Sequence, residues 1–228
     1  MPSLEINPKK VTRYLYLSIT VLAVLHIGNL FLYFWIDDPE KFDFIRLIDF
    51  DYEENLPTTF SSMLFFINAL LLWIIWRNER QIQGKDKIQW IVLSILFLYL
   101  GFDESAKIHE NLGDIIETYV NAEGYLYFPW SIAYLSIFAV LVVLYFPFFL
   151  RLPKSTKIKF VIAAVVFVTG AAGFDIISAK EAYENGTETI KYSVLYTIEE
   201  LMEMIGLVLF TGALMEVIKG REVSLNIS

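Results

Sequence analysis

The sequence contains no cysteine, which excludes disulfide bonds, thiolate metal sites and cysteine nucleophiles. It holds two histidines, His26 and His109, so a site that needs three imidazoles from one chain is excluded as well. Charged residues make up 19% of the chain, whereas about a quarter is typical of soluble domains. The net charge is -8, so no basic surface is large enough to neutralise a run of phosphates, and nucleic acid is not an expected partner.

What the chain has in abundance is long apolar segments, since 56% of its residues are hydrophobic. A helix needs about 20 largely apolar residues to cross a bilayer core. The segments that qualify are 14–36, 58–76, 88–108, 129–150, 160–178 and 194–215. The first is too long for the apolar region of a signal peptide and lacks a small-residue cleavage site, so it is expected to be retained. The sequence predicts an all-α, polytopic bundle of six transmembrane helices, with residues 1–228 as a single membrane domain.

Basic residues mark every second connection between these segments. They are Lys9, Lys10 and Arg13; Arg77, Arg80, Lys85 and Lys87; Arg151, Lys154, Lys157 and Lys159; and Lys219 and Arg221. The opposite connections, 37–54, 114–123 and 181–188, are rich in acidic residues. By the positive-inside rule, both termini are predicted to be cytoplasmic. The residue usage is typical of bacteria, so we expect a multi-pass protein of the bacterial cytoplasmic (inner) membrane, with the lipid bilayer as its first partner.

Ionisable residues inside the spans are costly and indicate function by default. With a rise of about 1.5 Å per residue, His26 lies roughly 18 Å from the cytoplasmic edge, and Asp103, Glu104 and Asp175 lie at roughly 22–24 Å. On the sixth span, Glu199, Glu200 and Glu203 reach a similar depth from the outer side. Independent accidents of sequence would scatter such residues. The pattern therefore predicts one polar site in the outer half of the bilayer.

The three glutamates of the sixth span share one helix face, because they are spaced by three and four residues. Carboxylates this close cannot all remain ionised in a low dielectric without a cation, shared protons or basic partners. On the third span, one stripe holds Asp103, Lys107, Glu110 and Asp114, and Lys107 can neutralise one of its carboxylates. His109 points away from Asp103 if that helix is regular. Either the helix breaks near His109, or His109 serves another face.

Each of these features also has a purely structural interpretation. A single histidine on an apolar helix, such as His26, is more often a hydrogen-bonded packing residue than a ligand. Asp175 follows small residues that permit close helix approach, and an acid at such a contact is expected to have a partner. The acids Asp49, Asp51 and Glu53 alternate as in some calcium loops. The segment lacks the glycine and distal glutamate of an EF-hand, so a solvated loop is the better prediction.

Two motifs carry a resemblance to known sequences. Asp103-Glu104-x4-His109-Glu110 and Glu199-Glu200-x2-Glu203-Met204 resemble paired motifs in uncharacterised bacterial six-helix membrane proteins. Asn55-x-Pro57-Thr58, followed by Ser61-Ser62, is similar to a third motif of the same group. The likeness covers nearly the whole chain. It implies the six-helix fold and brings no activity with it.

The polar layer favours a metal-dependent membrane enzyme that acts on a lipid-like or small substrate. The predicted metal ligands are His26, Glu104, His109, Asp175, Glu199 and Glu200. Glu203 and Asp103 are the predicted catalytic residues, with Glu203 as general base, and zinc or iron is the predicted metal. Two alternatives stay open: a proton- or cation-coupled transporter or sensor, and a non-catalytic subunit whose partners are other membrane subunits.

Overall fold

The computed structural model describes residues 7–36, 43–78 and 86–220, and in this part of the chain every regular element is helical. The helices are α1 (Pro8–Trp35), α2 (Asp43–Ile48), α3 (Leu56–Asn78), α4 (Lys87–Ala106), α5 (Ile108–Glu117), η3 (Gly124–Leu126), α6 (Trp130–Arg151), α7 (Lys154–Val168), η4 (Thr169–Phe174), α8 (Asp175–Asn185) and α9 (Ile190–Gly220). The prediction of an all-α chain is confirmed.

Six of these helical segments are long and apolar enough to cross a membrane. They are α1, α3, α4, α6, the continuous stretch Lys154–Asn185 formed by α7, η4 and α8, and α9 over Ile190–Lys219. The six predicted segments fall at the same places along the chain. Among the predicted connecting residues, Arg80, Lys85, Arg221 and the stretch 37–42 lie outside the described residues.

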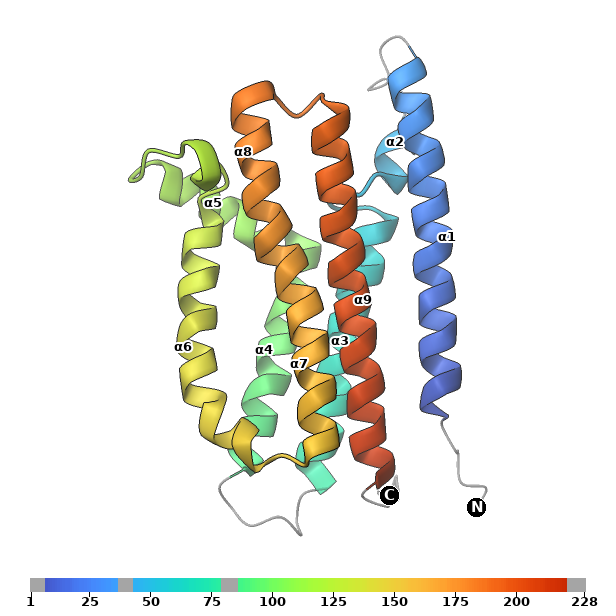
Figure 1. Cartoon of the computed structure of the whole chain (residues 1–228), viewed down its shortest axis with the longest axis vertical. Helices are drawn as coiled ribbons and strands as arrows, with labels where there is room; N and C mark the ends of the chain where they lie inside the picture. Colours follow the sequence, from blue (N-terminus) through green and yellow to red (C-terminus); the bar gives the residue numbers. More distant parts are fainter. Residues whose placement is uncertain (1–6, 37–42, 79–85, 221–228) are drawn as a thin grey trace.

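Helix α9 lies at the centre of the bundle and packs against α1, α3, α7, η4 and α8. Helices α3 and α4 form the other large pairwise contact. Figure 1 shows α1 at one edge of the bundle and α6 at the opposite edge. The start of α1 and the end of α9 lie at the same end, here called the terminal end. The short helices α2 and α5 lie toward the opposite, distal end.

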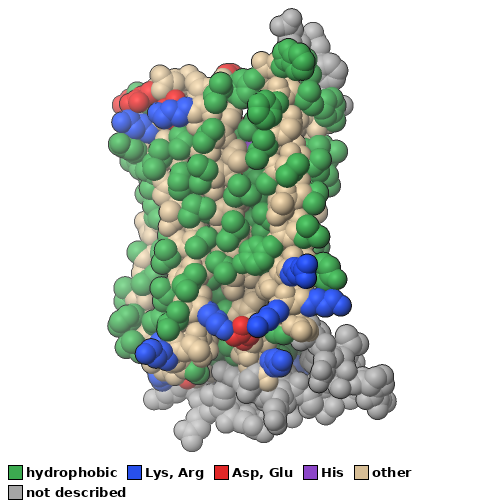
Figure 2. Space-filling view, turned by 45° about the vertical axis from the view of Figure 1, so that its right-hand side comes forward, with side chains coloured by type: hydrophobic (Ala, Val, Ile, Leu, Met, Phe, Trp, Pro, Cys, Tyr) green, Lys and Arg blue, Asp and Glu red, His purple; other side chains and the backbone are tan. Residues whose placement is uncertain are grey.

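The outer surface of the bundle is apolar over most of its height. Large hydrophobic side chains such as Phe31, Val143 and Leu144 are 65–74% exposed, which a soluble protein would avoid in such numbers. Figure 2 shows a broad band of apolar side chains, with Lys and Arg side chains gathered near the terminal end. This surface fits a protein solvated by lipid rather than by water.

The terminal half of the interior is closed by apolar packing. Leu72, Trp90, Phe148 and Leu214 form a buried cluster with neighbouring aromatic rings. Several buried polar groups in this half bond within the protein, although the buried Gln89 Oε1 has no partner among the described residues. Thr211 donates to Asn68 Oδ1 at 2.9 Å. Other such bonds join the Asn68 amide to the Leu207 carbonyl and the Ser94 hydroxyl to the Ala69 carbonyl. The polar residues with unusual chemistry therefore lie in the distal half.

Candidate functional site

A π-helical turn brings Asp175 into the bundle. The segment η4 interrupts the span between α7 and α8, and Asp175 is the first residue after it. Gly170 within this turn packs on α9 so closely that a Cβ there would lie 2.7 Å from the Glu199 carbonyl oxygen and 3.2 Å from Glu203 Cγ. The close helix approach predicted at these small residues is confirmed at Gly170. The π turn itself was not predicted, and such turns are frequent at functional sites.

A break between α4 and α5 brings His109 back toward Asp103. Lys107 ends α4 in the left-handed region, with φ 52° and ψ 39°, and α5 starts at the next residue. This conformation is uncommon for a residue with a side chain. The turn is held by the Asn111 side-chain amide, which donates to the Lys107 carbonyl at 2.7 Å. Of the two arrangements considered from the sequence, the structure has the broken helix.

His109 lies between two carboxylates. Its Nε2 is 3.0 Å from Glu53 Oε1, and its Nδ1 is 3.5 Å from Asp103 Oδ2. The other oxygen of Asp103 accepts a hydrogen bond from the Tyr134 hydroxyl at 2.8 Å. The edge of the Trp130 ring also packs on His109, with ring centroids 4.9 Å apart. Residues of α4, α5, α6 and the loop before α3 thus meet at one imidazole.

The glutamates of α9 face this group and Asp175. Glu200 interacts electrostatically with Glu53, Glu104 and Glu203, and Glu203 with Glu104, Glu199 and Asp175. Glu199 Oε2 lies 3.2 Å from the Ser178 hydroxyl on α8. We call this set the carboxylate cluster: Glu53, Asp103, Glu104, His109, Asp175, Glu199, Glu200 and Glu203.

The acids of the carboxylate cluster differ in burial. Asp103 and Asp175 are buried, at 5% and 3% exposure, whereas Glu104, Glu199, Glu200 and Glu203 are half-buried. One Asp175 oxygen, Oδ2, is buried and has no hydrogen-bond partner among the described residues. Unpaired buried carboxylate oxygens are costly, so this one is available to a ligand or a water.

Lysine and arginine side chains do not neutralise the negative charge of the carboxylate cluster. Within the described residues, its ion pairs are those of His109 with Glu53 and Asp103. The nearby lysines are used elsewhere: Lys107 lies 3.8 Å from Glu110, Lys180 lies 3.6 Å from Glu184, and Lys191 pairs with Glu181. The prediction that Lys107 pairs with one carboxylate of its stripe is therefore confirmed, and that carboxylate is Glu110. The carboxylate cluster keeps an excess of acids that protons or cations must compensate.

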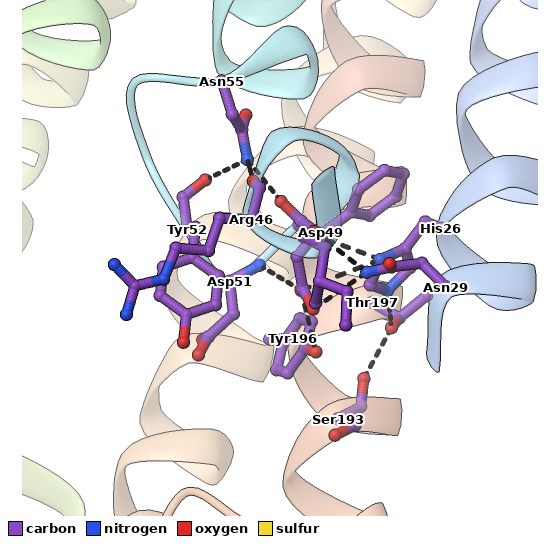
Figure 3. A network of polar contacts seen from close by, with 12 residues as sticks. His26, Asn29, Arg46, Asp49, Asp51, Tyr52, Asn55, Ser193, Tyr196 and Thr197 are labelled. Carbon is purple, nitrogen blue, oxygen red and sulfur yellow. Dashed lines mark hydrogen bonds and ion pairs between the residues drawn. The ribbon is translucent and has the colours of Figure 1, made fainter. Parts of the chain in front are cut away.

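His26 lies in a separate network, between α1, α9 and the loop before α3 (Figure 3). Its Nδ1 accepts a hydrogen bond from the Phe50 backbone N–H at 3.3 Å, and its Nε2 lies 2.9 Å from the Thr197 hydroxyl. That hydroxyl donates to the Ser193 carbonyl at 2.5 Å, so it accepts from Nε2. The ring also stacks on Phe50 with an interplanar angle of 7°. Both ring nitrogens are thus used within the protein, in the packing role that the sequence also allowed.

Asp49 links the same network to α1 and α9 (Figure 3). It accepts hydrogen bonds from the Tyr196 hydroxyl at 3.0 Å and from the Asn29 amide at 3.4 Å. Asn55 fixes the far end of the loop, because its side chain donates to the Tyr52 carbonyl at 2.6 Å and accepts from the Thr58 N–H at 3.1 Å. We call His26, Asn29, Asp49, Asn55, Tyr196 and Thr197 the loop-docking network.

The prediction of a solvated loop at residues 49–55 agrees with the exposure of Asp51 and Glu54 but is wrong for the buried Asp49. Asp49 is 3% exposed, Asp51 accepts a hydrogen bond from the Tyr192 hydroxyl at 2.8 Å, and Glu53 contacts His109. Each alternate acid therefore has a partner on a helix: Asp49 on α1 and α9, Asp51 on α9, and Glu53 on α5. The reason is tertiary: α1, α5 and α9 supply donors that composition and spacing along the loop cannot reveal.

The structure thus brings together most of the predicted site residues but separates one. Asp103, Glu104, His109, Asp175, Glu199, Glu200 and Glu203 belong to the carboxylate cluster. His26 belongs to the loop-docking network, where Asp49 is its nearest acid, with Nδ1 and Oδ1 3.7 Å apart. Three residues at the site were not among the predicted site residues: Glu53, Tyr134 and Ser178. For Glu53, the alternation of acids in the loop was the available signal.

The side chains of the cluster are not arranged around a single point. Among the described residues, no group of three or more His, Asp or Glu side chains has the geometry of a metal site. Ionised carboxylates repel one another, so ligation requires a cation that draws them together. The ligand atoms that the cluster can offer to a cation are carboxylate oxygens, because both histidines use their nitrogens in contacts with the protein.

Six apolar helices and a polar layer within them define a polytopic α-helical membrane protein with a carboxylate-rich site inside the bundle. The chain belongs to the family described as a domain of unknown function, DUF8692, which matches residues 14–217. No curated protein and no solved structure matched the chain.

The position of His109 leads to a pH prediction. Burial lowers the pKa of His109, but hydrogen bonding to Asp103 and Glu53 and their charges outweigh it and raise the pKa to about 11. A histidine with a raised pKa stabilises the folded state fully below its unfolded pKa of 6.5, and this contribution is lost as pH rises toward about 11.

We therefore expect the melting temperature of the wild type, measured with a chelator present, to fall between pH 6.5 and pH 11 more steeply than that of His109→Gln. The difference between the two curves isolates His109, because lysine and tyrosine residues titrate alike in both proteins. Parallel curves would show that the imidazolium does not hold these carboxylates.

Proposed function

We propose that this protein is a cation-dependent membrane enzyme with its site in the outer half of a bacterial cytoplasmic membrane. The observation that carries the proposal is the convergence of acids from α4, α8, α9 and the loop before α3, with His109 as their ion-pair partner. Such an excess of buried acid is expensive to maintain for packing alone. It becomes favourable when a divalent cation binds.

The donor set favours a hard cation over the zinc or iron first predicted. Zinc and iron sites in proteins commonly use histidine nitrogen or cysteine sulfur, and neither is free here. Magnesium, manganese and calcium prefer carboxylate, hydroxyl and water oxygens. We therefore assign the cation to Glu104, Asp175, Glu199 and Glu200, leave His26 out, and give His109 a positioning role.

For the reaction, we keep Glu203 as the general base and reassign Asp103. Glu203 is half-buried and interacts electrostatically with Glu104 and Glu199, so we place it beside the cation as the group that takes a proton from a water or substrate hydroxyl. Asp103 holds His109 and accepts from Tyr134, so its oxygens are occupied. When bound, the cation would polarise an oxygen of the substrate or acidify a water. A site at this depth suits a lipid-like substrate or a small one.

One feature supports a cytoplasmic terminal end, and a second supports an enzyme over a transporter. Lys and Arg side chains gather near the terminal end, as the positive-inside rule expects of a cytoplasmic face. The terminal half of the interior is closed by apolar and aromatic packing, whereas a transporter needs polar groups along a path to both sides. A polar site confined to the distal half fits an enzyme better than a transporter.

The first test is cation binding by the detergent-purified protein. Elemental analysis after purification without chelators, followed by Mn²⁺ titration monitored by electron paramagnetic resonance, should show stoichiometric binding. The Glu200→Gln/Glu203→Gln double variant should lose it. Glu216→Gln serves as control, because Glu216 also lies on α9 but pairs with Lys159 away from the cluster.

A wild-type protein that binds none of Mn²⁺, Mg²⁺ or Ca²⁺ would overturn the proposal. The cluster would then be a proton-linked site, or a charge network that specifies helix packing in a larger membrane complex. Binding that survives in the double variant would place the cation elsewhere.

A further inference from the structure

We infer that Glu53 supplies a further ligand to the cation site, delivered by the loop before α3, and that His109 and Tyr134 are its positioning residues. This inference rests on the proposed function. Its starting point is the asymmetry of the Glu53 carboxylate. Oε1 is held 3.0 Å from His109 Nε2, whereas Oε2 is buried and has no hydrogen-bond partner among the described residues.

The free oxygen belongs to a carboxylate that faces the cluster. Glu53 interacts electrostatically with Glu104 and with Glu200, on two different helices. No lysine or arginine among the described residues forms an ion pair with it. A carboxylate oxygen placed near two other acids, with no donor of its own, is positioned to bind a cation or a water on that cation.

A second unpartnered carboxylate oxygen, on a residue other than Glu53, also indicates a bound cation. Asp175 is 3% exposed, its Oδ2 has no partner among the described residues, and its charge acts on Glu199 and Glu203. It comes from α8, whereas Glu53 comes from the loop before α3. Two unpartnered buried carboxylate oxygens in one cluster match a bound cation that keeps several waters, as Mg²⁺ does.

The loop leaves Glu53 little freedom to point elsewhere. On one side of it, Tyr192 holds Asp51 and the loop-docking network holds Asp49. On the other side, Asn55 caps the start of α3. With the backbone fixed on both sides, the direction of the side chain is set by its contact with His109. A ligand held in this way loses little conformational entropy on binding.

His109 is in turn oriented by two residues that are not assigned to the cation. Asp103 contacts Nδ1, and the Tyr134 hydroxyl donates to the other Asp103 oxygen. This chain of contacts runs from α6 through α4 and α5 to the loop. Outer partners of this kind fix the ligands that they support, and their loss typically costs about 10–100-fold in metal affinity.

Two pairs of variants test the inference by Mn²⁺ affinity. Glu53→Gln keeps a side chain of the same shape but removes the charge, and we expect Mn²⁺ to bind about 10–100-fold more weakly. Its control is Glu54→Gln, the exposed neighbouring acid. Tyr134→Phe removes one hydroxyl and should weaken binding about tenfold. Its control is Tyr145→Phe, which removes another hydroxyl that joins α6 to α4, at the Gln89 carbonyl.

The outcomes separate this inference from the proposed function. If the wild type binds no cation, the proposed function fails. If the wild type binds Mn²⁺ and Glu53→Gln binds it equally well, the role of Glu53 fails and the cation site stands. Melting temperatures in chelator distinguish positioning from folding: a Tyr134→Phe protein with unchanged melting temperature and weaker Mn²⁺ binding supports positioning. Weakening equal to that of Tyr145→Phe would overturn it.

Discussion

Replacing Gly206 with alanine should lower the free energy of unfolding by about 1–3 kcal/mol, the usual cost of overpacking a tight contact. A Cβ at this position would lie 2.7 Å from Phe167 Cβ, 2.8 Å from the Phe167 backbone nitrogen and 2.9 Å from its Cα. Two of these atoms are backbone, so no rotamer change can make room. Helix α7 would have to move away from α9, and the Gly170 contact beside Glu199 would loosen with it.

The matched control is Gly28→Ala on α1. A Cβ added there meets no heavy atom within 4 Å among the described residues, so the substitution tests helix propensity alone. We expect it to be neutral or to stabilise by up to about 1 kcal/mol. Equilibrium unfolding in mixed detergent and lipid micelles measures both variants. If Gly206→Ala unfolds like the wild type, the close approach of α7 and α9 is wrong.

Neutralising the α9 glutamates should stabilise the cation-free protein. In chelator, Glu200→Gln/Glu203→Gln removes two acids from a cluster that has His109 as its ion-pair partner. Relief of such functional strain commonly yields about 0.5–2 kcal/mol per site. The wild type should gain more than the variant when a cation is added, because ligand at 100 times its Kd stabilises by about 2.7 kcal/mol.

Melting curves of both proteins with chelator and with saturating Mn²⁺ give the four values needed. The expected pattern is a crossover: the variant melts higher without cation, and the wild type approaches or exceeds it with cation. Glu216→Gln should follow the wild type in its response to Mn²⁺. A double variant that melts lower than the wild type in chelator would show that these glutamates stabilise the fold through contacts of their own.

The membrane spans were predictable because a bilayer imposes its thickness on the sequence. Roughly 20 apolar residues are required for each crossing, and this signal survives without knowledge of tertiary contacts. The convergence of Asp103, Glu104, Asp175 and the α9 glutamates also followed from depth and helix periodicity. These inferences depend on the rise and turn of a helix, which are the same in every sequence.

The features that the sequence left open or missed depend on departures from regular helix geometry or on tertiary contacts. Lys107 adopts a left-handed conformation with no glycine to signal it, and without that break His109 would point away from Asp103. The π turn before Asp175 has no reliable pattern in sequence. His26 has the right depth for the site, but its partners Phe50 and Thr197 belong to a loop and a helix face that only the folded chain brings to it.

The central position of α9 has a consequence for biosynthesis. Among the six spans, α9 is made after the other five, yet α1, α3, α7 and α8 all pack against it. Helix α1 is made long before its main partner, and the His26–Thr197 contact cannot form until α9 is present. Membrane insertion can proceed span by span, whereas assembly of the bundle must wait for α9. A chain that ends before Ile190 would therefore be inserted but lack the helix around which its other spans gather.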